Sequence, residues 1–136
     1  MKKLVKILVV NDENIILVKQ YREQIQRYTI ELPGGKVKRG ETSSEAAVRE
    51  LAEETGIQTD SLIDLGSYIN SQRSIMVSFF FTDSILEHSQ QKLDNDEDIQ
   101  VLSYSMQSVI NNLSTKEWND LRISMALSIS KSKGLI

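Results

Sequence analysis

The chain has 136 residues, a formal net charge of −3 and no cysteine. This length predicts one globular domain, residues 1–136, and the lack of cysteine excludes disulfide bonds and thiolate metal sites. The charge balance offers no basic stripe for a nucleic-acid polymer, and no apolar run approaches the length of a membrane span. Basic residues precede an apolar run at the N-terminus, but no small-residue cleavage site follows. We therefore expect a cytoplasmic protein.

Apolar and β-branched runs bounded by polar turns predict six strands. The predicted strands are residues 4–10, 15–21, 28–32, 61–69, 75–82 and 99–104. The first two form a hairpin across a polar four-residue turn. Residues 75–82 are apolar on both faces, which predicts a central strand of the sheet. Residues 22–27 and 83–96 are polar, and we expect them to be loops.

Three helices are predicted along the chain. The first begins near Ser43, because Thr42 and Glu45 have the spacing of a capping box, and it ends at Gly56, which supplies a left-handed C-cap. A short helix is expected over residues 106–113. A longer helix then follows. Its cap would be Ser114 or Thr115, and its predicted buried stripe is Trp118, Leu121, Met125 and Leu127 or Ile129.

This order of strands and helices predicts an α/β (α+β) fold, in which a mixed sheet lies between helices.

Three glutamates crowd the first predicted helix. Glu53 and Glu54 follow Glu50 at i+3 and i+4, so all three lie on or near one face. Like charges at this spacing destabilise a helix by a few tenths of a kcal/mol per pair. A hard cation such as Mg²⁺ would turn the repulsion into attraction, because it binds carboxylate oxygens. Arg49 lies four residues after Glu45 and four before Glu53, so it can form an ion pair with either carboxylate. The alternative is a solvated acidic surface.

The stretch 35–57 has the spacing Gly-x5-Glu-x7-Arg-Glu-Leu-x-Glu-Glu-x-Gly-Ile, which resembles the signature of the Nudix hydrolases without a departure. The resemblance implies the Nudix α/β/α sandwich with a mixed sheet. It also implies hydrolysis of a nucleoside diphosphate linked to another moiety, with water attacking phosphorus. The implied metal is Mg²⁺ or Mn²⁺, and the implied partner is a small nucleotide substrate. Members of the family often dimerise, so a homodimer stays open.

The family motif implies a role for each charged residue of this stretch. Glu50 and Glu54 would be the inner metal ligands. Glu53 would be a further ligand or a partner of the attacking water. Glu41 would lie outside the inner ligands, with a loop ion pair as the alternative. Arg49 would orient the carboxylates.

Two further roles are expected outside the helix. Gly34, the residue before the first glycine of the motif, would offer its carbonyl oxygen to a metal. A general base is expected on the acidic loop before the last strand. We select Glu97 because it lies close to the apolar strand, and Asp94 and Asp96 remain open. The alternative for this loop is a solvated acidic segment without a catalytic role.

Two stretches, Val-Lys-Gln-Tyr-Arg ending at Arg22 and Glu-Leu-Pro-Gly-Gly beginning at Glu31, resemble the ADP-ribose pyrophosphatase branch. In that branch the arginine contacts phosphate, a role that suits a planar guanidinium. Arg22 and Glu31 are therefore candidates for substrate binding, and ADP-ribose or a nucleoside diphosphate sugar is the expected substrate.

Two departures keep alternatives open. The branch often carries a proline shortly after the motif, where this chain has Asn70-Ser71. Its long N-terminal segment is also expected to be absent, since the first predicted strand begins at residue 4. A nucleoside triphosphate pyrophosphatase is therefore the main alternative. A nucleotide sensor without hydrolytic activity is a remote one, because every glutamate of the motif is present.

Overall fold

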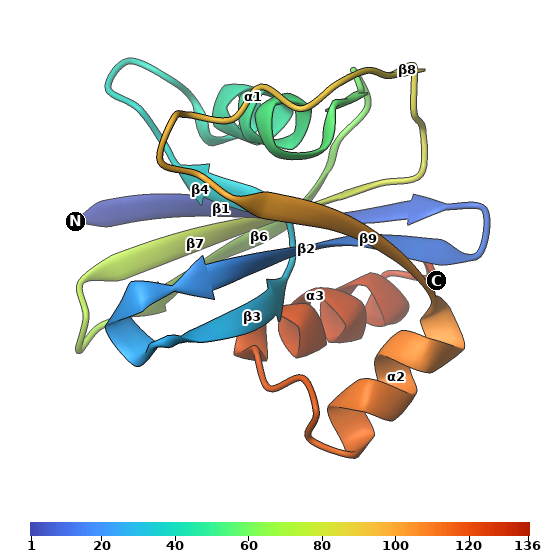
Figure 1. Cartoon of the computed structure of the whole chain (residues 1–136). Helices are drawn as coiled ribbons and strands as arrows, with labels where there is room; N and C mark the ends of the chain where they lie inside the picture. Colours follow the sequence, from blue (N-terminus) through green and yellow to red (C-terminus); the bar gives the residue numbers. More distant parts are fainter.

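The computed structural model describes residues 1–136. Helix α1 (Ser43–Thr55) covers one face of a mixed sheet, and helices α2 (Met106–Ser114) and α3 (Leu121–Ser132) cover the other (Figure 1). The predicted α/β/α sandwich is therefore confirmed. None of the helices has the length and apolar character needed to cross a bilayer.

Seven strands form the main sheet. They are β1 (Lys2–Asn11), β2 (Asn14–Arg22), β3 (Arg27–Glu31), β4 (Gly34–Lys36), β6 (Ile63–Asn70), β7 (Ile75–Thr82) and β9 (Ile99–Ser105). The order is β3-β2-β1-β7-β6, while β4 pairs with β1 and β9 pairs with β2. The β1–β7 pair is parallel and the other pairs are antiparallel.

The six predicted strands all form, and β7 lies between β1 and β6 as expected for a central strand. Three short strands were not predicted: β4, and the pair of β5 (Ile57–Gln58) with β8 (Glu87–His88). A strand of two or three residues is too short to show a hydrophobic period. The predicted loop at residues 22–27 also contains a 3-10 turn, Glu23–Ile25.

Both predicted ends of α1 are confirmed. The Thr42 hydroxyl accepts a hydrogen bond from the Glu45 amide at 3.1 Å, and the Glu45 carboxylate accepts one from the Thr42 amide at 3.0 Å. Gly56 closes the helix with φ 77°, a left-handed conformation that glycine adopts without a steric penalty. The sequence therefore fixes the ends of this helix through contacts that are local in the chain.

The prediction for the last helix is wrong at its start. Helix α2 ends at Ser114, and Lys116 adopts a left-handed φ of 64°, which interrupts the helical path. Helix α3 begins only at Leu121, where the Asp120 carboxylate accepts a hydrogen bond from the Arg122 amide at 2.8 Å.

The later start also changes the buried face of α3. The buried residues are Ile123, Ala126 and Ser130, whereas Leu121 is 79% exposed. Trp118 lies before the helix and packs edge-to-face against Tyr104, with 4.8 Å between ring centroids. The prediction placed the start of the helix several residues too early, and an error of this size rotates the apolar stripe.

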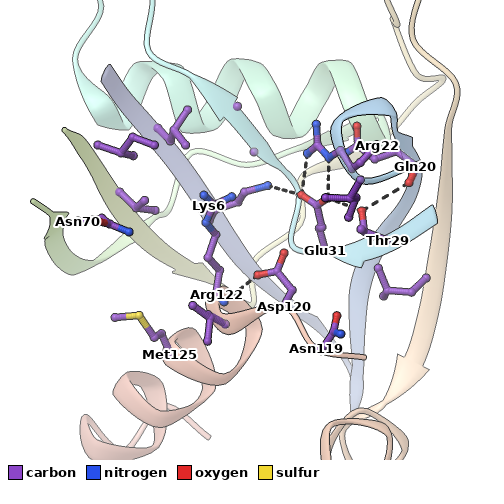
Figure 2. A pocket seen from close by; sticks show the side chains of 18 of the residues that line it. Lys6, Gln20, Arg22, Thr29, Glu31, Asn70, Asn119, Asp120, Arg122 and Met125 are labelled. Carbon is purple, nitrogen blue, oxygen red and sulfur yellow. Dashed lines mark hydrogen bonds and ion pairs between the residues drawn. The ribbon is translucent and has the colours of Figure 1, made fainter. Parts of the chain in front are cut away.

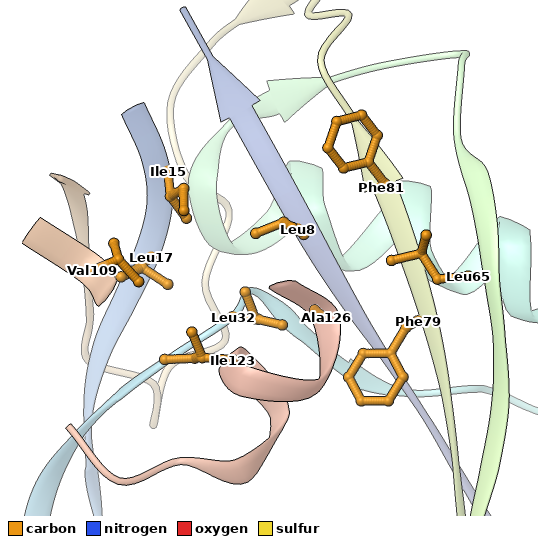
Figure 3. Packing of buried hydrophobic residues seen from close by; sticks show 10 residues of the cluster. All are labelled: Leu8, Ile15, Leu17, Leu32, Leu65, Phe79, Phe81, Val109, Ile123 and Ala126. Carbon is orange, nitrogen blue, oxygen red and sulfur yellow. The ribbon is translucent and has the colours of Figure 1, made fainter. Parts of the chain in front are cut away.

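Side-chain alternation along β1 divides the interior into two clusters. Val5, Ile7 and Val9 face α1, whereas Leu8 faces α3. Lys6 is two residues before Leu8 and therefore also lies on the α3 face. Figure 3 shows the cluster on this side, which consists of Leu8, Ile15, Leu17, Leu32, Leu65, Phe79, Phe81, Val109, Ile123 and Ala126.

We expect the Thr42→Ala variant to lose about 1 kcal/mol of stability, because the first turn of α1 loses its capping hydroxyl. Urea unfolding measures this difference, and Ser44→Ala is the matched control, because Ser44 is exposed and its side chain makes no hydrogen bond in the structure. Equal unfolding midpoints for the two variants would contradict a stabilising role for the cap.

Candidate active site

A cavity of 1530 Å³ opens on the α3 face of the sheet and reaches the motif helix α1. Its walls come from the β2–β3 hairpin, β1, β4, the β6–β7 hairpin and the segment that precedes α3. Six of the predicted site residues line it: Arg22, Glu31, Gly34, Glu50, Glu54 and Glu97. The other three, Glu41, Arg49 and Glu53, do not line it. The fold therefore brings together residues that are up to 75 positions apart, from Arg22 to Glu97.

Glu54 is a buried carboxylate with little compensation. Glu54 is 4% exposed, and the only group of the protein that donates a hydrogen bond to its carboxylate is the Gly34 amide, at 2.8 Å. No cationic side chain forms an ion pair with it. The pKa of Glu54 is raised to about 7, chiefly by burial and also by the charges of Glu50 and Glu97, which together outweigh the lowering by the Gly34 hydrogen bond and by Lys6.

Glu50 lies one turn earlier on the same helix and faces the same cavity. It accepts a hydrogen bond from Arg49 Nη1 at 2.9 Å. Burial raises its pKa, the bond and charge of Arg49 lower it, and the charges of Glu53 and Glu97 raise it. A Cβ atom at Gly35 would lie 2.6 Å from the Glu50 carboxylate, so a larger residue there would displace this carboxylate from its present position.

Arg49 connects three carboxylates at the edge of the site. Its Nε and Nη2 atoms donate to Glu41 at 2.6 and 2.9 Å, and its Nη1 atom donates to Glu50 and to Glu53, the latter at 3.2 Å. The hydrogen bond from Arg49 is the main reason why the pKa of Glu41 falls to about 2. Glu41 also accepts a hydrogen bond from the Lys38 amide, which fixes its carboxylate. Glu41 thus holds Arg49 in place and does not line the cavity.

Glu97 faces the cavity, whereas Asp94 and Asp96, the other candidate bases, do not line it. The Glu97 carboxylate accepts a hydrogen bond from the Asp94 amide at 2.9 Å, which closes a short turn. Its charge contributes to the raised pKa values of Glu50 and Glu54. Among the three candidate bases, the geometry therefore favours Glu97.

Glu31 accepts hydrogen bonds from two cationic side chains, Arg22 and Lys6, at the other side of the cavity (Figure 2). Arg22 donates to both of its oxygens, at 2.8 and 2.7 Å, Lys6 donates at 3.2 Å, and the Thr29 hydroxyl also donates. Burial would raise the pKa of Glu31, but Arg22, Lys6 and Thr29 outweigh it and hold that pKa well below its usual range. Two cations share one carboxylate here.

Lys6 and Thr29 were not predicted as site residues. Lys6 is 3% exposed, and its ammonium also donates to the Leu32 carbonyl at 3.1 Å. The sequence carries one signal for Lys6. This lysine interrupts the apolar run of β1 and lies on the same face as Leu4 and Leu8, which are both buried. Thr29 carries no comparable signal.

The donor set fits a divalent cation that keeps water or substrate oxygens among its ligands. No group of three or more acidic or histidine side chains is arranged to hold a metal by itself. Glu50 and Glu54 nevertheless present two partly compensated carboxylates to one cavity, and Mg²⁺ in proteins is commonly bound by one or two carboxylates plus phosphate oxygens and water. A buried carboxylate is stable only when it is paired, protonated or bound to a metal.

Several known proteins resemble this chain in sequence. The model of the NUDIX domain matches residues 2–126. The chain is 32% identical over 128 residues to an ADP-ribose pyrophosphatase of Bacillus subtilis, and the matched region covers 90% of this chain and 69% of the relative. It is 35% identical over 88 residues to the 8-oxo-dGTP diphosphatase of Escherichia coli, which covers 61% of this chain and 68% of that protein.

The fold also matches a solved structure, described as an ADP compounds hydrolase, with a TM-score of 0.84 and 23% identity. The match covers 99% of this chain and 76% of the other. With the domain match and the identity to the pyrophosphatase, the chain belongs to the Nudix hydrolase family.

We expect a divalent metal to stabilise the protein through Glu54. Excess Mg²⁺ at about 100 times its Kd should add about 2.7 kcal/mol to the free energy of unfolding. In the metal-free protein the pKa of Glu54 is raised, so the unfolded chain releases this proton at a lower pH than the folded protein does. The free energy of unfolding therefore falls as the pH rises from the usual carboxyl range towards 7. Stabilisation by Mg²⁺ should therefore increase from about pH 5 to about pH 8.

Thermal unfolding with Mg²⁺ and with EDTA measures this effect. Glu54→Gln should lose the metal-dependent shift, whereas Glu13→Gln, at the exposed β1–β2 turn, should keep it. A full shift in Glu54→Gln would exclude Glu54 as a ligand.

Proposed function

We propose that this Nudix hydrolase is a metal-dependent pyrophosphohydrolase that cleaves the diphosphate of ADP-ribose or of a related nucleoside diphosphate sugar. The observation that carries this proposal is the arrangement of one cavity, in which the carboxylates of α1 lie at one side and the Arg22–Glu31–Lys6 cluster at another. A diphosphate carries negative charge that suits both a metal ion and a guanidinium.

The size of the cavity supports a substrate with two moieties. Its 1530 Å³ exceeds the roughly 300–1,000 Å³ of common small-molecule pockets. Beyond the charged region its walls include Tyr68 and Trp118, which offer apolar surface to a base or a sugar. The similarity to an ADP-ribose pyrophosphatase over 90% of the chain supports the same substrate class.

Each candidate residue of the site then has a chemical role. Glu50 and Glu54 would hold the metal with Glu53 nearby, and Gly34 would offer its carbonyl. The metal, when bound, neutralises phosphate charge and lowers the pKa of water.

In the reaction, Glu97 accepts a proton from the attacking water. The water oxygen forms a bond to one phosphorus, and the bond from that phosphorus to the bridging oxygen breaks. Arg22 binds a phosphate oxygen with the donors that Glu31 leaves free. The products are a nucleoside monophosphate and a sugar phosphate.

Supporting residues keep these groups in place. Arg49 orients Glu50 and Glu53, and Glu41 holds Arg49. Because Glu31 already accepts bonds from three side chains, we assign it chiefly the positioning of Arg22, and its direct contact with substrate stays a prediction. The identity of the metal as Mg²⁺ or Mn²⁺ and the formation of a homodimer stay open, and a cytoplasmic location stays a prediction.

A nucleoside triphosphate pyrophosphatase is the second candidate, because the chain also resembles an 8-oxo-dGTP diphosphatase. That similarity covers 61% of the chain, compared with 90% for the ADP-ribose pyrophosphatase. Reaction products separate the two activities. A diphosphate sugar yields two phosphomonoesters, whereas a triphosphate yields a monophosphate and pyrophosphate.

We expect the protein to convert ADP-ribose to AMP and ribose 5-phosphate in the presence of Mg²⁺ and to be inactive with EDTA. Chromatography of the products, with nucleoside diphosphate sugars and deoxynucleoside triphosphates assayed in parallel, measures this activity. Release of pyrophosphate from triphosphates, with no cleavage of any diphosphate sugar, would move the assignment to the second candidate.

We expect Arg22→Gln to raise KM for the diphosphate substrate roughly 10- to 100-fold, because a hydrogen bond to a charged group contributes about 1.5–3 kcal/mol. Steady-state kinetics with ADP-ribose measures KM and kcat separately. Arg39→Gln is the control, since Arg39 is exposed, lies outside the cavity and has no side-chain partner. An unchanged KM in Arg22→Gln would exclude its contact with phosphate.

A further inference from the structure

The segment of residues 86–92 covers the C-terminal end of the metal-binding helix α1. The last carbonyl groups of a helix have no partner within it. Here each of four consecutive carbonyls, from Glu53 to Gly56, receives a hydrogen bond from this segment. The pairs are Lys92 N to Glu53 O at 2.7 Å, Gln91 Nε2 to Glu54 O at 2.7 Å, His88 Nε2 to Thr55 O at 3.1 Å and Ser89 N to Gly56 O at 2.7 Å.

Gln91 differs from the other members of the segment because it has a second partner. Its amide nitrogen donates to the carbonyl of Glu54 on α1 and also to the carbonyl of Ile99 at 2.8 Å. Ile99 is the first residue of β9. The two amide hydrogens of one half-buried side chain therefore join the end of α1 to the start of the last strand.

Glu97 lies between these two fixed points. Figure 1 shows the chain between β8 and β9 passing along α1 before it enters the sheet. Within that stretch, the Glu97 amide donates to the Asp94 carbonyl at 3.0 Å, and the Asp94 amide donates to the Glu97 carboxylate. These bonds are internal to the turn, so they shape it without fixing it against α1. Gln91 and the Lys92 amide supply the contacts with α1.

We propose that Gln91 is a positioning residue that holds Glu97 at a fixed place relative to Glu54. The inference rests on the proposed function, because it assumes that Glu97 and Glu54 act on one substrate. The Gln91 side chain does not line the cavity, so it acts only through the backbone that it joins. Without the Gln91 amide, the hydrogen bonds that join the end of α1 to the start of β9 are lost. The turn of residues 92–98 is then free to move relative to α1, and Glu97 samples positions away from the attacking water.

Gln91→Met is the decisive variant, because methionine keeps the length of the side chain and removes both donors. Gln90→Met is the matched control, since Gln90 is exposed and its side chain has no hydrogen-bond partner. We expect kcat to fall roughly 10- to 100-fold in Gln91→Met with little change in KM, as for a small misplacement of a catalytic group. The control should keep the kcat of the wild type, and equal kcat values in both variants would overturn the proposal.

A double-mutant cycle separates positioning from a general structural role. In the Glu97→Gln background, Gln91→Met should cause no further loss of kcat, because the group that it positions is already removed. A loss as large as in the wild-type background would overturn the proposal. So would full activity of Glu97→Gln alone, because Gln91 would then have nothing to act through.

A readout without turnover tests the same claim in the metal-free protein. Hydrogen–deuterium exchange of residues 92–98 should accelerate at least about tenfold in Gln91→Met and stay unchanged in Gln90→Met, because local opening controls amide exchange. Unchanged exchange in both would overturn the proposal. The kinetic assays use whichever substrate the wild type cleaves fastest, so failure to cleave ADP-ribose would contradict the proposed substrate and leave this test intact.

Discussion

The burial of the Glu54 carboxylate is the constraint on which the rest of the site depends. Ala46, Ala47 and Leu51 pack α1 onto the apolar face of β1, and this packing carries Glu54 beneath β4. Removing a charge from water costs several kcal/mol, and one amide hydrogen bond does not offset it. Under the proposed function, a metal ion shared with Glu50 offsets this cost. Apolar packing and metal affinity would then be two consequences of one helix placement.

The charged side chains in and around this cavity form two separate clusters of ion pairs, and Glu54 belongs to neither. Arg49 is bound to Glu41, Glu50 and Glu53 at the outer edge, whereas Lys6 and Arg22 are held by Glu31 on the other side. Neither Lys6 nor Arg22 forms an ion pair with Glu54. A substrate that is anionic and also binds metal satisfies both sides at once, and a diphosphate has both properties.

Local patterns in the sequence predicted α1 with both caps and six strands, because capping boxes and strand alternation depend on near neighbours in the chain. The six predicted site residues that line the cavity came instead from the resemblance to the Nudix motif and to the ADP-ribose pyrophosphatase branch. Contacts between distant residues were not predicted. Lys6 pairs with Glu31 across 25 positions, and Gln91 bonds Glu54 across 37. The start of α3 was missed because Ser114, Thr115 and Asp120 are all competent caps, and only the left-handed backbone at Lys116 decides among them.

The central claim is that Glu50 and Glu54 bind one divalent cation in contact with a diphosphate. Crystals grown with Mn²⁺ and a non-hydrolysable analogue of ADP-ribose test it directly through anomalous scattering. The account predicts one anomalous peak that contacts both carboxylates, with the diphosphate between that ion and Arg22. A fully bound analogue with no metal at Glu50 and Glu54, or with its diphosphate outside this cavity, would contradict it.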